Sequence, residues 1–141
     1  NADFSGAGLF CSLKDATIEN LVIDSSCSFT GFNAGALSVS LDGSLTVKHT
    51  TNYAAVSGSY RVGGFIGYVD YVKQPLIVSF EHCVNHGIVT GSDWYVGGFV
   101  GLIYNNTNMT LSISNSFNNG FVTGSDHYVG GLVGYITTTP L

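Results

Sequence analysis

The chain has 141 residues, of which 9% are charged and 45% are hydrophobic, and its formal net charge is −5. Its four basic residues, Lys14, Lys48, Arg61 and Lys73, are scattered, so nucleic acid and anionic membranes are unsuitable partners. No apolar run approaches the roughly 18 residues of a membrane span, which argues against membrane insertion, while the apolar content suits a folded domain rather than a disordered chain.

Along the chain, short runs of alternating apolar and polar residues recur. Alternation with a period of two predicts β-strands, and the abundance of Val, Ile, Phe, Tyr and Thr supports this assignment. Signals for helices are almost absent. The runs are ATIENLVI at 16–23, SLTVKH at 44–49, PLIVSF at 75–80 and TLSISNSF at 110–117.

A glycine-rich segment precedes each run and becomes more regular toward the C-terminus. Its clearest copies lie in VTGSDWYVGGFVG at 89–101 and VTGSDHYVGGLVG at 122–134. Aligning one glycine of each segment gives intervals of 27, 29, 34 and 33 residues and predicts four units and the start of a fifth. The glycines aligned in this way are Gly8, Gly35, Gly64, Gly98 and Gly131.

The repeat length predicts a β-solenoid, in which successive rungs stack roughly 4.8 Å apart through parallel hydrogen bonds. A β-propeller is the alternative, but its blades usually need 40 or more residues. We therefore predict one all-β domain over 1–141, a β-solenoid (parallel β-helix) of four to five rungs with about three short strands per rung. The rungs are degenerate over 1–57 and regular over 58–141.

Stacking predicts that equivalent side chains form columns, with Val62, Val96 and Val129 inside and a second interior column from Phe65 to Leu132. Glycines are expected where the chain turns sharply or where two backbones approach closely. The predicted structural glycines are Gly63, Gly64, Gly67, Gly97, Gly98, Gly101, Gly130, Gly131 and Gly134.

The sequences VGGFIG at 62–67, VGGFVG at 96–101 and VGGLVG at 129–134 resemble the GLUG motif. This glycine-rich repeat occurs in large cell-surface and secreted proteins, including bacterial adhesins and passenger regions of some IgA-specific peptidases. The resemblance covers 58–136 closely and 1–57 weakly. It implies a β-solenoid stalk or an adhesive surface, and it brings no catalytic residues with it.

No residue set with recognisable chemistry emerges, so we expect no enzyme activity, no metal and no cofactor. His82 and His86 would lie roughly 13 Å apart along a strand, which is too far for one metal ion. Asp93 and Asp126 occupy equivalent bends and could share a calcium ion, but an Asx-type turn explains both more simply.

Aromatic residues beside the glycine core form the candidate ligand or partner surface. Tyr60, Tyr95 and Tyr128 are expected to point away from the valine column as an exposed ladder, with Trp94 and His127 beside them. Such a ladder would stack on sugar rings or pack against another chain. The alternative is a stack that only stabilises the sheet.

Two kinds of covalent modification are candidates. Asn105 and Asn108 begin overlapping N-x-[ST] sequons, which are acceptors for N-glycosylation in a secreted chain. The three cysteines are either small buried apolar residues or include a Cys11–Cys27 disulfide that leaves Cys83 free.

The polar but uncharged composition is typical of extracellular β-structures. The predicted function is therefore that of a non-enzymatic structural or adhesive repeat protein, located outside the cell or on its surface. The expected self-association is end-to-end stacking into a filament or a longer array, because no polar cap is evident at either end. The alternative is a carbohydrate-binding solenoid that presents its Tyr/Trp ladder to a glycan or a host-cell partner.

Overall fold

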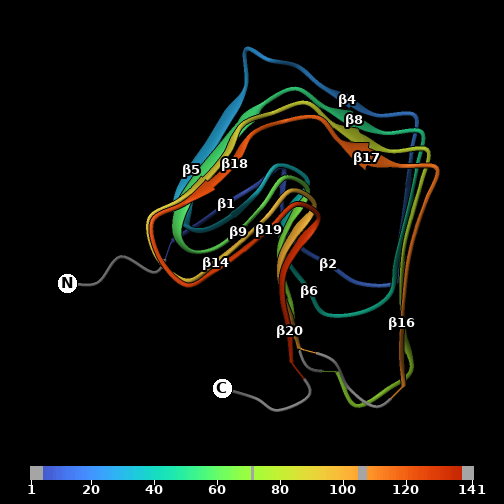
Figure 1. Cartoon of the computed structure of the whole chain (residues 1–141). Helices are drawn as coiled ribbons and strands as arrows, with labels where there is room; N and C mark the ends of the chain where they lie inside the picture. Colours follow the sequence, from blue (N-terminus) through green and yellow to red (C-terminus); the bar gives the residue numbers. More distant parts are fainter. Residues whose placement is uncertain (1–4, 71, 105–107, 138–141) are drawn as a thin grey trace.

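The computed structural model describes residues 5–70, 72–104 and 108–137, which form strands and no helix. The chain winds through four turns and the beginning of a fifth, and every strand pairing is parallel. Equivalent strands of successive turns lie above one another (Figure 1). The predicted all-β solenoid is confirmed.

The strands follow one order in each turn. The first turn contains β1 (Gly6–Ala7), β2 (Phe10–Leu13), β3 (Ala16–Glu19) and β4 (Val22–Ile23), and the second β5 (Ser28–Gly35), β6 (Ser38–Leu41), β7 (Leu45–Lys48) and β8 (Thr51–Asn52). The third contains β9 (Ala55–Gly63), β10 (Ile66–Val69), β11 (Leu76–Glu81) and β12 (Val84–Asn85). The fourth contains β13 (Val89–Gly91), β14 (Tyr95–Gly97), β15 (Val100–Tyr104), β16 (Met109–Ser114) and β17 (Phe117–Asn118), and the fifth β18 (Val122–Gly124), β19 (Tyr128–Gly130) and β20 (Val133–Thr137).

Each complete turn contains four or five strands, rather than about three, because corners divide the predicted segments. One corner separates β16 from β17, which the sequence pattern joins as a single run. Another separates β13 from β14, whereas β9 passes through both positions without a break. The first sheet therefore bends back on itself beside the second sheet, formed by β2, β6, β10, β15 and β20 (Figure 1).

The interior columns expected from the repeat are present. Val96 pairs in register with Val62 on one side and Val129 on the other, and both Val62 and Val96 are fully buried. The rings of Phe65 and Phe99 lie 4.9 Å apart in the neighbouring part of the core. Alternating inward apolar residues thus join successive turns into one continuous core.

A column of asparagines, on β8, β12 and β17, also runs inside the solenoid. Nδ2 of Asn52 donates to Oδ1 of Asn85 at 2.8 Å, and Nδ2 of Asn85 donates to Oδ1 of Asn118 at 2.8 Å. Each amide also bonds its own bend, as Nδ2 of Asn85 does to the carbonyl of Gly87 at 3.0 Å. Asn52 and Asn85 are fully buried. Because an unsatisfied buried amide is costly, this ladder holds the turns in one register.

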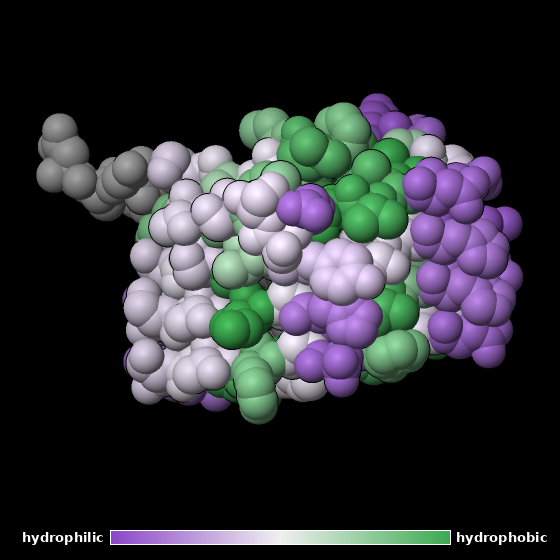
Figure 2. Space-filling model, turned by 90° about the horizontal axis from the view of Figure 1, so that it is seen from above, coloured by the Kyte–Doolittle hydropathy of each residue, from purple (hydrophilic) through white to green (hydrophobic). Residues whose placement is uncertain are grey.

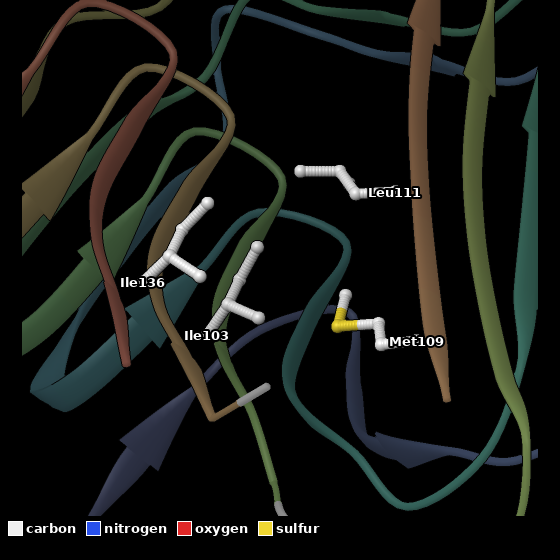
Figure 3. Close-up of a pocket in the computed structure, with 4 residues that line it drawn as sticks. All are labelled: Ile103, Met109, Leu111 and Ile136. Carbon is white, nitrogen blue, oxygen red and sulfur yellow. The ribbon is translucent and has the colours of Figure 1, made fainter. Parts of the chain in front are cut away.

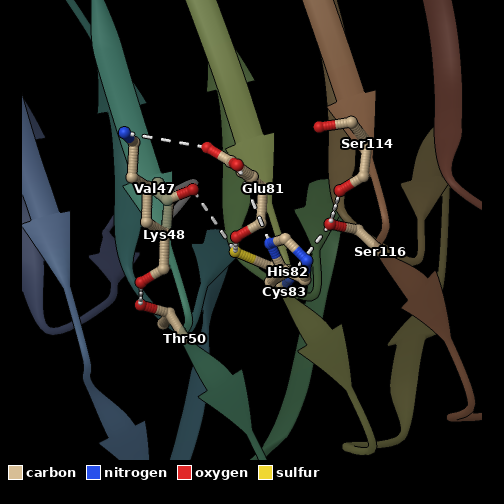
Figure 4. Close-up of polar contacts among 8 residues, drawn as sticks. All are labelled: Val47, Lys48, Thr50, Glu81, His82, Cys83, Ser114 and Ser116. Carbon is tan, nitrogen blue, oxygen red and sulfur yellow. Dashed lines mark hydrogen bonds and ion pairs between the residues drawn. The ribbon is translucent and has the colours of Figure 1, made fainter.

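A second ladder forms the corner between β16 and β17 and their equivalents (Figure 4). One residue in each turn has a left-handed backbone with φ of 47° to 56°, which Asn and His tolerate better than most residues. These residues are Asn20, His49, His82 and Asn115. The next residue returns a hydrogen bond to the carbonyl two positions earlier, as Thr50 does at 3.0 Å, Cys83 at 3.4 Å and Ser116 at 2.7 Å.

The glycines serve close backbone approach, since none of the described glycines has a positive φ. A Cβ on Gly97 would lie 2.0 Å from the carbonyl oxygen of Val100. Register also corrects our alignment of the early turns. Gly35 pairs with Gly63 and not with Gly64, so Gly8 and Gly35 belong to the first glycine of each pair.

Candidate functional site

The C-terminal end of the solenoid exposes its core. The strands of the last complete turn and the partial fifth turn, β16 to β20, each pair on one edge only within the described chain. Val129 is 44% exposed, Leu132 38% and Ile136 49%, whereas the residues below them in the same columns are fully buried. We call this surface the open end.

A hollow lies at the open end, between β15 and β20 on one side and β16 on the other (Figure 3). It has a volume of about 140 Å³, and Figure 3 shows its side chains pointing toward one another. The described side chains that line it are all apolar and are Ile103, Met109, Leu111 and Ile136. Its shape and chemistry suit another apolar side chain better than a polar ligand.

The predicted aromatic ladder is divided into two columns by the register of the strands. Tyr95 pairs with Tyr128 above it and with Arg61 below it. The sequence predicts that Tyr60 lies in the same column as Tyr95, and this is wrong. Tyr60 instead shares a column with Trp94 and His127. The alignment erred by one residue because Arg61, rather than Tyr60, directly precedes the inward valine of that turn.

The outer aromatic column consists of Phe32, Tyr60, Trp94 and His127. The rings of Phe32 and Tyr60 stack at 5.3 Å, and those of Trp94 and His127 at 4.3 Å. Tyr60 and Trp94 meet edge to face at 6.5 Å. Because most ring faces are occupied by neighbouring rings, this column chiefly stabilises the stacking of the turns and presents ring edges outward.

Tyr95 and Tyr128 belong to a packed aromatic cluster between β14 and β15 and their equivalents. Their rings stack at 5.3 Å, and Tyr135 packs against both. Tyr95 is only 2% exposed, so it is not the exposed partner residue that the sequence predicts. Below it, the guanidinium of Arg61 lies 4.4 Å from the ring of Tyr68 and donates to the hydroxyl of Tyr104 at 3.1 Å.

Burial in this aromatic cluster raises the pKa of the Tyr95 phenol to about 12, with smaller contributions from the surrounding tyrosines. The folded state therefore holds this proton more tightly than the unfolded chain, whose tyrosine pKa is about 10. The stabilisation is complete below pH 10 and is lost as the pH rises from 10 toward 12.

We expect wild type to lose about 1 kcal/mol of stability at pH 11 that Tyr95→Phe does not lose. Urea unfolding of both proteins at pH 8 and at pH 11 measures this difference directly. Equal losses in the two proteins would show that Tyr95 ionises as freely in the folded state as in the unfolded chain.

A hydroxyl-lined hollow of about 460 Å³ lies beside the outer aromatic column. Thr30, Ser57 and Thr90 stack in register along it, and the hydroxyls of Thr30 and Ser57 are 2.9 Å apart. Among the described residues the lining contains no charged side chain; these residues are Ser5, Thr30, Gly31, Phe32, Ser57, Gly58, Ser59, Thr90 and Ser92.

The three cysteines are free thiols, so the alternative of a Cys11–Cys27 disulfide is wrong. Cys11 lies on β2, whereas Cys27 lies in the bend between β4 and β5, on a different part of the turn. Both are exposed, which also corrects their interpretation as buried apolar residues. Cys83 is fully buried, and this burial raises the pKa of its thiol.

We therefore expect Ellman's reagent to titrate two thiols rapidly in the native protein and the third only after denaturation. The native Cys83 should stay unreactive because it is both shielded and held in the protonated form. Cys83→Ser should leave the rapid count unchanged and abolish the slow thiol. A native count of zero or one would restore the disulfide.

The remaining candidate residues do not converge on one site. His82 stacks on His49 at 4.9 Å and His86 on Tyr53 at 4.9 Å, in separate columns. Within the described residues, no three potential metal ligands come together. Asn108 is exposed, as a glycosylation acceptor must be, whereas Asn105 lies outside the described residues.

Figure 2 shows the molecule from above, over the sheet formed by β4, β8, β12 and β17. A hydrophilic band follows one edge of this face, and hydrophobic patches lie in its middle. The exposed apolar residues in and beside this sheet are Val22, Ile88, Phe117 and Phe121. None of the described segments is a helix long and apolar enough to cross a membrane.

No family model and no curated protein matches this sequence, so membership of the GLUG family stays a prediction. The fold does match a crystal structure from Bacteroides ovatus, described as a "putative immunoglobulin A1 protease", with a TM-score of 0.67 and 24% identity. The match covers 92% of this chain but 42% of that one. A likeness at this identity establishes the shared fold.

This comparison corrects the expectation that the chain is not an enzyme. The structure with the same fold carries the name of a protease. The absence of a recognisable catalytic set in the sequence was therefore an insufficient reason to exclude enzymatic activity, because a solenoid of this kind also occurs in a protein named as an enzyme.

Proposed function

We propose that this chain serves as a segment of an elongated β-solenoid scaffold that is extended at its open end by further turns. The observation that supports this most is that the interior columns run in register through successive turns and reach the open end uncovered. Val129 and Ile136 continue columns that are fully buried in the preceding turns. In repeat proteins, stability comes from such contacts between neighbouring repeats.

The matching crystal structure is longer than this chain, which spans less than half of its length. Side-chain networks also run mainly between turns. The asparagine ladder, the corner ladder and the stacked aromatic rings each join residues about one repeat apart. A scaffold requires such coupling between neighbouring turns.

An added turn tests this proposal. In the extended chain, a copy of residues 105–137 follows Thr137. Because Thr137 pairs with Tyr104, the residue after Thr137 is equivalent to residue 105, and the copy continues the repeat in register. We expect its Tm to exceed that of the original chain by about 5 °C or more, because core contacts are added without a new fold. The matched control carries the same added residues in scrambled order. Equal Tm values for the extended chain and the control would contradict the proposal.

The hydroxyl-lined hollow favours a second candidate function, binding of an uncharged carbohydrate. Its volume lies in the range of ligand pockets, about 300–1,000 Å³, and hydroxyls without charge suit a sugar better than an ion. The outer aromatic column would contribute ring edges rather than the open faces expected from the sequence. Location outside the cell, glycosylation and filament formation stay predictions alongside it.

Affinity electrophoresis in gels containing dextran, galactomannan or xyloglucan tests this binding. Retardation by one polysaccharide that is lost in Thr90→Val would support it. Thr123→Val is the matched control, because Thr123 lies in the same column as Thr90 but outside the hollow. Equal migration of wild type and Thr90→Val in every gel would contradict carbohydrate binding at this site.

A further inference from the structure

We infer that the open end selects one kind of partner: a parallel β-solenoid turn that places an asparagine above Asn118 and a glycine above Gly131. This inference rests on the proposed function and adds the chemistry by which the next turn is chosen. Two polar and steric features of the open end carry it, in addition to the exposed apolar residues.

The first feature is the unfinished asparagine ladder. Asn52 and Asn85 each donate to their own bend and to the asparagine above, and Nδ2 of Asn52 also donates to the carbonyl of Gly64 at 3.2 Å. Asn118 donates to the carbonyl of Gly120 at 2.9 Å, and its Oδ1 accepts from Asn85. An amide nitrogen has two N–H donors, and the second one of Asn118 has no acceptor within the described chain. The carbonyl oxygen of another asparagine would complete the ladder.

The second feature is the space around Gly131. A Cβ on Gly64 would lie 2.0 Å from the carbonyl oxygen of Gly98, and a Cβ on Gly98 2.1 Å from that of Gly131. Both would also press on the asparagine that follows later in the same turn, at 2.8 Å for Asn85 and 2.6 Å for Asn118. A Cβ on Gly131 would meet nothing within 4 Å. Gly131 thus keeps the space that a following asparagine and glycine carbonyl would fill.

The first turn of a second copy would not supply these groups. Ile23 occupies the asparagine column there, since it pairs in register with Asn52. The register aligns Ala7 and Phe10 of the first turn with Val62 and Ile66 of the third. The first turn has one residue fewer between these two positions, and the residue that it lacks is the second glycine of the pair. The partner that fits resembles the third and fourth turns, so this inference opposes the end-to-end stacking of identical chains that the sequence predicts.

Thermal unfolding of matched chains tests the inference. In the first comparison, the extended chain is set against a version in which the added copy of Asn118, and not Asn118 itself, is replaced by leucine. In the second, Gly131→Ala is introduced into both the original and the extended chain. We expect leucine to remove at least half of the gain in Tm. Gly131→Ala should change the Tm of the original chain by less than about 2 °C and abolish most of the gain in the extended one.

The outcomes separate this inference from the function on which it rests. If the asparagine and leucine extensions stabilise equally, or if Gly131→Ala has the same effect in both backgrounds, the selection by Asn118 and Gly131 is overturned while the scaffold function stands. If no extension raises the Tm, both fail. Concentration-dependent association of the original chain in sedimentation velocity would also overturn the inference, because its first turn carries Ile23.

Discussion

Asn85→Ala should destabilise the protein by about 3–5 kcal/mol or prevent folding altogether. The substitution removes the middle member of the asparagine ladder. It leaves the buried Nδ2 of Asn52 and Oδ1 of Asn118 without their partners at 2.8 Å and opens a cavity beside them. The bend at Gly87 also loses a hydrogen bond from the side chain. Chemical denaturation followed by circular dichroism measures the loss.

Asn119→Ala is the matched control for this prediction. Asn119 lies in the same type of bend but is exposed, and its amide contacts only the ring of His86. Its replacement should change stability by no more than about 0.5 kcal/mol. If both variants proved equally mild, the ladder would be a consequence of the stacking and not one of its causes.

Gly97→Ala should have an effect of similar size for a steric reason. The added Cβ would lie 2.0 Å from the carbonyl oxygen of Val100 and 2.7 Å from the amide nitrogen of Gly134. Both obstacles are backbone atoms, which cannot move aside as a flexible side chain would. We expect a loss of more than about 3 kcal/mol, seen as a low soluble yield and a much reduced Tm.

Gly131→Ala provides the control. Gly131 is the second glycine of the same motif one turn later, next to Gly130, which is the residue that pairs with Gly97. Because a Cβ on Gly131 would enter open space, the substitution should change stability by no more than about 0.5 kcal/mol. A large loss at Gly131 and a small one at Gly97 would reverse the order that close backbone approach requires, and the account of the repeated glycines would have to be abandoned.

The repeat, the strands and the inward valine and phenylalanine columns could all be predicted from the sequence. These follow from local alternation and from spacing, which do not depend on which turn lies next to which. The sequence also indicated the glycines as structural residues. It gave no sign that Asn85 faces inward, because an asparagine before His and Gly is typical of an exposed turn.

Which residues share a column, and which columns are buried, could not be predicted from the sequence because both depend on how the turns pair. The pairing of Tyr95 with Arg61 follows from the register between turns, and a shift of one residue moves a side chain to another face. Tyr95 is buried because the first sheet bends back beside the second. Cys11 and Cys27 are apart because Cys11 lies on β2, whereas Cys27 lies in the bend between β4 and β5. The proposed roles of Asn118 and Gly131 likewise follow only from the equivalent residues in the turns stacked below them.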